Sequence, residues 1–512
     1  MRQTLNVPLS RRDFGALAAG TGLAVTSFPG AMAAGFTGDG LERARPEDQG
    51  VDPAAFTALL DALANEKQEM NSLMFARGGK VIFEGWWWPY LPARKHMMHS
   101  LTKSTLACAV GIALAEKRFA LSDKVVSFFP EHLPAQVSDN LKAMTVEHLL
   151  TMRCGHAAET SGSVWRPIKT SWIAEFFKIP VELPPGSKFV YTSAASYMLS
   201  AIVTKTAGQT ARDYLETRMF QPLGIIDAEW DSSPDNVSPG GNGLTWRTSD
   251  IIKMCMLHAQ RGIWNRKQIL PADWIAAASK RQDGNARYGY QWWISPKNNY
   301  YALGKFTQIG LVFPEHDAVV ALTSANDKGH HMVEIIEKIF PAAFKAAPLP
   351  RNDGAWSALK TRADGLRLLP PLAQTTSPLE QKLSNQVFDV EPNEDGVQSL
   401  GFRFANGACV FTQQDARGAH TVTSGLRDWV ESVTSMTGAK LHHEYEPSSM
   451  PVVAGATWTN PNTLEMTWQF VESSFRDHVV CRFDGPTLTF DRSVNINSSS
   501  LSRPTLKAHV RS

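Results

Sequence analysis

Strand-like patterns lie at both ends of one long stretch of the chain, and mostly helix-like patterns with Pro and Gly turns lie between them. Two short apolar runs, at 73–76 and 81–83, flank an Arg-Gly-Gly-Lys turn and predict a β-hairpin. Far downstream, three more strand-like runs follow, at 300–306, 311–313 and 318–323. This order predicts an α+β fold, in which an antiparallel sheet is built from both ends, flanked by helices, with a helical subdomain inserted.

The last part of the chain has a different pattern. Residues 346–380 are rich in Pro, Ala and Thr, which predicts a partly ordered linker that can hold a short helix. Residues 381–512 are strand and turn throughout, with apolar and polar residues alternating along 464–470. We therefore expect a first domain at 34–345, a linker at 346–380, and a small antiparallel β-sandwich or barrel at 381–512.

The N-terminus has the features of an export signal. Arg11-Arg12 precede a short apolar segment rich in Ala and Gly, which ends in Ala31-Met32-Ala33. Paired arginines, a short apolar core and an A-x-A site predict a twin-arginine signal over residues 1–33, and hence a periplasmic or secreted protein. No later run is long enough to span a bilayer, and a formal charge of +2 gives no indication of a nucleic-acid partner.

The cysteines indicate neither a disulfide framework nor a metal site. Their number is odd, their spacing is wide, and no C-x-x-C pair occurs among Cys108, Cys154, Cys255, Cys409 and Cys481. The chain also has no clustered His, Cys and Asp set of the kind that zinc needs. We expect buried, unpaired thiols and no metal or cofactor.

A serine and a lysine three residues apart stand before the apolar run 106–114. On a helix, Ser100 and Lys103 would share one face and place a hydroxyl beside an amine. A buried lysine with a lowered pKa can activate a serine hydroxyl as a nucleophile. The same spacing recurs at Ser357 and Lys360 in the predicted linker, so the motif alone is also compatible with an exposed pair at the start of an ordinary helix.

A second motif makes the first more specific. Tyr191-Thr192-Ser193 follows Pro185-Gly186 and opens a helix-like run. Together with Ser100 and Lys103, this pattern resembles the serine β-lactamase and penicillin-binding-protein superfamily, in its class C-like branch of esterases, D-peptidases and nylon-oligomer hydrolases. That branch carries Tyr-x-Asn or Tyr-x-Ser here. The resemblance extends over residues 45–345, with further similar stretches at 145–151, 240–250 and 311–324.

The third motif of the family, Lys-Thr-Gly or His-x-Gly on an inner strand, is altered here. In the favoured register it is Ala302-Leu303-Gly304, and in the other register it is Lys305-Phe306-Thr307. The resemblance implies that Gly304 leaves the backbone open for substrate and that the N–H groups of Lys305 and Ser100 form an oxyanion hole. Thr307 would replace a family glycine and crowd the cleft. The stretch is also compatible with an inner strand that has no oxyanion role.

The resemblance implies a serine hydrolase whose partner is a small-molecule ester or amide. Ser100 would form the acyl-enzyme, and Lys103 and Tyr191 would share acid–base catalysis, with the identity of the base left open. Ser193 would contribute to the substrate site. Because Ala302 replaces the cation that holds a carboxylate in β-lactamases, an ester or amide substrate is favoured. A β-lactamase, a D-Ala-D-Ala carboxypeptidase and a catalytically idle penicillin-binding-type protein are the alternatives.

Overall fold

The computed structural model describes residues 38–160, 162–282, 287–384, 386–436 and 438–511. The predicted export signal at 1–33 lies outside these residues. No helix in the described ranges is both long and apolar enough to cross a membrane. All five cysteines are buried and unpaired.

A six-stranded sheet forms the first part of the structure, and it confirms the predicted α+β fold. Its order is β2-β1-β11-β10-β9-β8, and all neighbouring strands are antiparallel. The two strands of the early hairpin thus pair with strands from the distant end of the domain, with Phe75 opposite Val320. The strands are β1 (Met70–Arg77), β2 (Lys80–Trp86), β8 (Trp293–Ile294), β9 (Tyr300–Gly304), β10 (Gln308–Phe313) and β11 (Ala318–Ser324).

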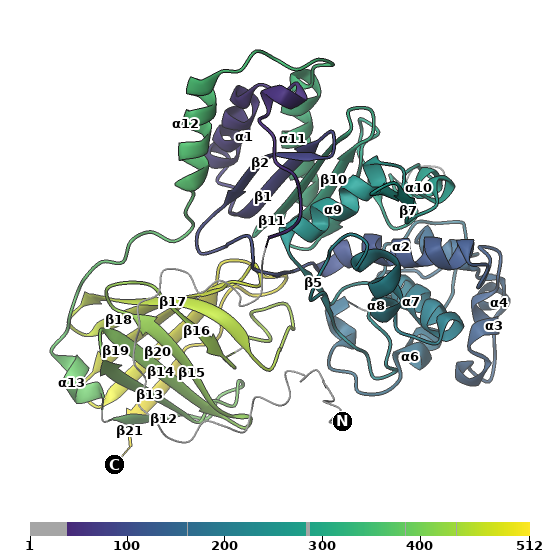
Figure 1. Cartoon of the computed structure of the whole chain (residues 1–512). Coiled ribbons are helices and arrows are strands. Elements are labelled where there is room, and N and C mark those ends of the chain that lie inside the picture. The colour runs from purple at the N-terminus through teal and green to yellow at the C-terminus, as the bar shows by residue number, and fades with distance from the viewer. Residues whose placement is uncertain (1–37, 161, 283–286, 385, 437, 512) are drawn as a thin grey trace, which may run out of the picture. The chain divides into compact units, whose positions relative to one another are not determined.

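Helices pack against this sheet, as Figure 1 shows. α1 (Pro53–Asn65) and α11 (Gly329–Ala343) bury aromatic rings against β1. The ring centroid of Phe75 lies 5.4 Å from that of Phe56 and 4.3 Å from that of Phe340. α9 (Thr248–Ala259) contacts β1, β10 and β11 and belongs to the core of the inserted part. At the start of α1, the Asp52 side chain accepts from the Ala54 N–H and Pro53 occupies the first helical position.

The segment expected to be a linker holds a twelve-residue helix, α12 (Asp353–Asp364). α12 packs against α1 and β2 through Leu359, which is buried. Ser357 and Lys360, the second serine–lysine pair, are exposed on this helix, and Lys360 pairs with Asp364 at 3.4 Å. Ser357 and Lys360 therefore lie on the solvent-exposed face of an ordinary helix.

The inserted part is helical and is organised around α2 (Thr102–Ala115). Nearly every residue of α2 is buried, and the helix packs against α7 (Ser193–Ala207). Its other helices are η3 (His99–Leu101), α3 (Val125–Phe128), η4 (Pro130–His132), α4 (Asp139–Ala143), α5 (Val146–Leu150), η5 (Gly162–Trp165), α6 (Trp172–Lys178), α8 (Ala211–Leu215), η6 (Glu216–Phe220) and α10 (Ala272–Ala278), while η2 (Glu47–Gln49) precedes α1. A three-stranded sheet of order β3-β5-β4 and a two-stranded sheet of β6 and β7 complete it. The strands are β3 (His96–Met97), β4 (Glu229–Trp230), β5 (Leu244–Trp246), β6 (Ile263–Trp264) and β7 (Lys267–Gln268).

The C-terminal part is a β-barrel preceded by α13 (Leu379–Leu383). Nine strands follow one another in the order β15-β14-β13-β12-β21-β20-β19-β18-β17, and β15 meets β17 through Gly425 and Gly455. This closure selects the barrel over the sandwich. β16 pairs with β17 along the residues just before Gly455. The strands are β12 (Val387–Val390), β13 (Ser399–Ala405), β14 (Ala408–Asp415), β15 (Gly418–Gly425), β16 (Val430–Thr434), β17 (Met450–Asn460), β18 (Thr463–Phe470), β19 (Arg476–Asp484), β20 (Thr487–Val494) and β21 (Leu506–Val510).

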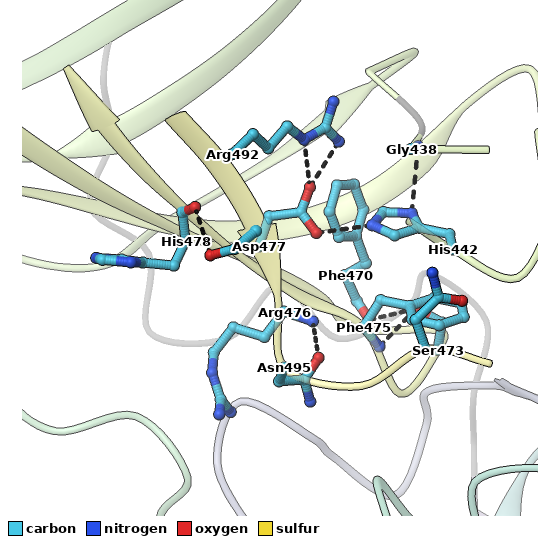
Figure 2. A network of polar contacts seen from close by, with 12 residues as sticks. Gly438, His442, Phe470, Ser473, Phe475, Arg476, Asp477, His478, Arg492 and Asn495 are labelled. Atoms are coloured by element: carbon cyan, nitrogen blue, oxygen red, sulfur yellow. Dashed lines mark hydrogen bonds and ion pairs between the residues drawn. The ribbon is translucent and has the colours of Figure 1, made fainter. Parts of the chain in front are cut away.

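A buried ionic network joins the barrel to its loop 438–446. Figure 2 shows Asp477 between His442 and Arg492, with His442 Nε2 2.7 Å from Asp477 Oδ1 and Arg492 Nε 2.7 Å from Asp477 Oδ2. The Gly438 N–H donates to His442 Nδ1, so Nε2 carries the proton given to Asp477. Burial acts to raise the pKa of Asp477, but the facing Arg492 charge and these hydrogen bonds hold that pKa below its usual value.

We predict that Asp477→Asn destabilises the barrel by about 3–5 kcal/mol, because it leaves the Arg492 charge buried without its carboxylate. Urea denaturation followed by tryptophan fluorescence measures this, since Trp468 lies beside Arg492. The matched control is Asp389→Asn, whose carboxylate pairs with Arg511 at the exposed surface and whose loss should move the midpoint little. Equal midpoints for Asp477→Asn and wild type would contradict the structural importance of the network.

Candidate active site

Ser100 and Lys103 lie together, as the motif predicts. Ser100 is in the short helix η3, directly before α2, and Lys103 is on the first turn of α2. Lys103 Nζ is 3.0 Å from Ser100 Oγ. The residue before the nucleophile candidate, His99, has a φ of 47°, a left-handed conformation that is uncommon for a residue with a side chain. Such strain is often found at functional sites.

The Lys103 amine is buried and surrounded by polar groups of the protein. Its Nζ also lies 2.9 Å from Ser193 Oγ, at the start of α7, and 2.9 Å from the carbonyl oxygen of Gly241. The side chain is only 1% exposed, and this burial lowers the pKa of Lys103 to about 7. Burial disfavours the charged ammonium, while the Glu159 carboxylate acts in the opposite direction. The amine is therefore substantially neutral near neutral pH.

Tyr191 is on the other side of the pair. The centroid of its ring lies 4.8 Å from Lys103 Nζ, and the ring stacks on that of Trp293 with 5.4 Å between the centroids. Burial raises the pKa of Tyr191, and a hydrogen bond with Ser100 only partly offsets this effect. The phenol therefore stays protonated at neutral pH. Thr192 caps α7 by accepting from the Ala194 N–H, which places Ser193 at the first position of the helix, facing Lys103.

The third motif lies beside Ser100, at the end of β9. A Cβ on Gly304 would stand 2.1 Å from the carbonyl oxygen of Met98, so this glycine is required for the close approach of β9 to the chain that leads into Ser100. The space that a side chain would fill is thus occupied by Met98, rather than left open for substrate as we expected. Ala302 is fully buried and does not line the pocket, whereas Lys305 is exposed and does.

Thr307 is buried in the turn between β9 and β10. Its φ is 71°, and its hydroxyl donates to the carbonyl oxygen of Asn326 at 2.7 Å. The hydroxyl is thus used within the turn, although the residue also contributes to the pocket lining.

A pocket of about 560 Å³ brings these elements together. The predicted residues Ser100, Tyr191, Ser193, Gly304 and Lys305 line it, and Lys103 is buried beneath them. Further lining residues were not predicted from the sequence: Glu159, Arg166, Asn242, Trp293, Asp327, His330, His443 and Ser498. The last two belong to the barrel, and no sequence pattern connected them to the catalytic motifs.

Comparison with known proteins gives distant relatives. Esterase EstB of Burkholderia gladioli is 25% identical over 205 residues, which are 35% of this chain and 52% of EstB, so the match spans about half of that enzyme. An uncharacterised protein of Alkalihalophilus pseudofirmus is 22% identical over 268 residues, 45% of this chain and 73% of that protein.

Among solved structures, a candidate 6-aminohexanoate-dimer hydrolase from Bacillus anthracis superposes with a TM-score of 0.50 at 18% identity. It covers 61% of this chain and 89% of its own, and this likeness concerns the fold alone. The sequence profile of the family described as Beta-lactamase matches residues 61–343, more than half of the chain. The buried lysine–serine pair thus lies within the matched region, and the chain belongs to the Beta-lactamase family.

Proposed function

We propose that the protein is a serine hydrolase that cleaves a carboxylic ester or amide through an acyl-enzyme on Ser100. The observation that carries this proposal is the position of the buried Lys103 amine, 3.0 Å from the Ser100 hydroxyl. A binding protein without catalytic activity would have no need to bury an amine at this cost and direct it at a serine.

The hydrogen bonds around Lys103 support its role as the base. The Gly241 carbonyl can only accept, and Ser193 Oγ can accept as well, so a neutral amine gives its two protons to them. Its lone pair then faces the Ser100 hydroxyl. Lys103 takes that proton as Ser100 Oγ bonds to the substrate carbonyl carbon, and the carbonyl π electrons move to oxygen. Tyr191, whose pKa is raised, is suited to donate a proton rather than to accept one.

The rest of the cycle uses the same groups. The N–H groups of Ser100 and Lys305 stabilise the tetrahedral oxyanion, and one such donor typically contributes about 3–4 kcal/mol. As the bond to the leaving group breaks, Tyr191 protonates that group and is reprotonated from Lys103. Water then attacks the acyl carbon with the same residues in reversed roles, and the acid product leaves Ser100.

An ester or amide is the favoured substrate class over a β-lactam. In the favoured register, Ala302 stands where β-lactamases of this superfamily carry a cation, and its buried side chain offers a carboxylate no partner. The relative EstB is named an esterase, which supports the same preference.

We predict that Ser100→Ala abolishes both ester hydrolysis and covalent labelling by a fluorophosphonate probe, because the nucleophilic oxygen is removed. Intact mass before and after the probe, together with p-nitrophenyl acetate turnover, measures the two effects. Ser357→Ala is the matched control, since it belongs to an identically spaced but exposed serine–lysine pair on α12.

Loss of labelling in Ser357→Ala with retention in Ser100→Ala would reject the proposed nucleophile. Nitrocefin turnover that rivals the turnover of p-nitrophenyl esters would reject the preference for esters and amides and favour the β-lactamase alternative.

We predict that kcat/KM rises with pH through a midpoint of about 7, because only neutral Lys103 can accept the serine proton. Glu159 raises the pKa of Lys103, so Glu159→Gln should move this rising limb to lower pH. Glu175→Gln, at an exposed pair with Lys178 on α6, is the control and should leave the limb in place. A limb that stays fixed in Glu159→Gln, or moves to higher pH, would contradict Lys103 as the base.

We also propose that the protein is exported by the twin-arginine route, on the basis of Arg11-Arg12 and Ala31-Met32-Ala33. Expression in a bacterium with an intact twin-arginine pathway should yield a processed form in the periplasm or medium. Arg11→Lys combined with Arg12→Lys should leave the unprocessed chain inside the cell, as shown by fractionation and N-terminal sequencing. Processing that is unchanged by the double substitution would reject this route.

A further inference from the structure

The barrel contributes two side chains to the pocket that contains Ser100. They are His443, on loop 438–446, and Ser498, on the loop after β20. The Ser498 hydroxyl lies 2.7 Å from His443 Nδ1. On the pocket side, the His443 ring lies 6.0 Å from the ring of His99, the residue that precedes Ser100. A residue of the barrel is therefore a near neighbour of the chain that carries the candidate nucleophile.

His443 is held firmly in this position. The preceding residue, His442, is bound to Asp477 in the buried network of Figure 2 and stacks on Phe475 at 4.6 Å. On the other side, Arg166 donates to the His443 carbonyl oxygen and lies 3.6 Å over the Tyr445 ring. These contacts enforce a left-handed backbone at His443, with a φ of 54°. Strain of this kind persists only when the surrounding structure fixes it, and it often accompanies function.

Two cations, Arg166 and Lys305, act on this side of the pocket, and one carboxylate, Asp231, interacts with Arg166. Burial, together with the nearby Arg166 and Lys305 charges, lowers the pKa of His443 to about 4. The same two cations act on His99, whose pKa burial also lowers. The acidic lining residue Glu159 acts instead on Lys103 and Tyr191, at the catalytic side. Arg166 and Lys305 thus act on the side of the pocket that faces the barrel, and Asp327 is a further acidic residue of the lining.

Hydrogen-bonding groups on this side have no protein partner. Among the described residues, His443 Nε2 has no hydrogen-bond partner and the Lys305 amine has no carboxylate partner. Both ring nitrogens of His99, which is 2% exposed, likewise have none within the described part of the chain. When the Ser498 hydroxyl donates to Nδ1, the imidazole proton of His443 is on Nε2, and this nitrogen can donate to a ligand.

We propose that His443, oriented by Ser498 and assisted by the field of Lys305 and Arg166, is a specificity-determining residue that binds an anionic group of the substrate, with a carboxylate as the chemical class. This inference rests on the proposed ester or amide hydrolysis and adds that the barrel completes the substrate site. It places the carboxylate on the barrel side of the pocket, away from buried Ala302. An acyl chain or leaving group that ends in a carboxylate would then be bound better than its neutral counterpart.

Two matched substrate pairs test this selectivity. In the first, p-nitrophenyl hydrogen glutarate is compared with p-nitrophenyl pentanoate, so that the carboxylate is on the acyl side. In the second, 3-acetoxybenzoate is compared with phenyl acetate, so that it is on the leaving group. At least one anionic substrate should have a kcat/KM about ten- to a hundredfold higher than its neutral partner, the range of one hydrogen bond to a charged group.

The substitution His443→Asn should reduce this ratio towards one, mainly through a higher KM for the anionic substrate. Asparagine tolerates the left-handed backbone, so the loop can keep its conformation. Ser498→Ala should reduce the ratio in part, since it frees the imidazole to change tautomer. The matched control is His478→Asn, an exposed imidazole of the same barrel paired with Glu465, which should preserve the wild-type ratio.

Titration calorimetry of the full chain with glutarate tests the subsite without turnover. Glutarate should bind wild type at least about tenfold more tightly than His443→Asn. The subsite is rejected if neither substrate pair shows a preference, if the preference survives in His443→Asn, or if glutarate binds both proteins equally. Absence of any ester hydrolysis and of Ser100 labelling would instead reject the proposed function, while the calorimetric comparison would still decide on the subsite.

Discussion

The site depends on the burial of one amine. A lysine removed from water needs polar partners, and Lys103 finds them on three separate segments, at Ser100, Ser193 and the Gly241 carbonyl. These partners come from η3, α7 and the turn before β5, so one side chain requires that three segments be fixed relative to one another. Glycine permits the contact, because a Cβ on Gly241 would stand 2.8 Å from the Ser193 Cβ. The burial of Lys103 against Ser193 thus joins α2 to α7 and also lowers the pKa of the lysine.

A second buried ionic group has a comparable effect in the barrel. Asp477 is fully buried, and its two oxygens are engaged by His442 and Arg492. Because the His442 side chain is fixed by Asp477, the backbone at the next residue, His443, has few accessible conformations. The barrel strands supply the rigid frame, and the network transfers that rigidity to the loop at the catalytic pocket. Lys103 thus fixes the segments around Ser100, and Asp477 holds the barrel loop that reaches the same pocket.

Local patterns in the sequence were sufficient for the fold and for the catalytic motifs. Five of the six strands of the sheet followed from strand-like runs at both ends of the first domain, while the two-residue strand β8 was not predicted. Alternation along 464–470 indicated the second domain. Ser100, Lys103, Tyr191 and Ser193 belong to short motifs with fixed spacing. The Gly241 carbonyl could not be predicted, because a backbone oxygen has no residue signature. Nor could His443, which reaches the pocket only through tertiary contacts of a loop more than three hundred residues away from Ser100.

Burial favours the uncharged form of several ionisable groups in this pocket, and this determines which side chains carry its charge. Desolvation favours neutral forms of Lys103, Tyr191, His99 and His443 near pH 7. The groups proposed to carry out the chemistry are consequently a weak source of charge for selecting a substrate. Charge comes from side chains such as Lys305, at the third motif, and Arg166, which no motif includes. Under the proposed function, the serine–lysine–tyrosine set is compatible with many substrates, and the barrel loop is a segment outside this set from which selectivity can come.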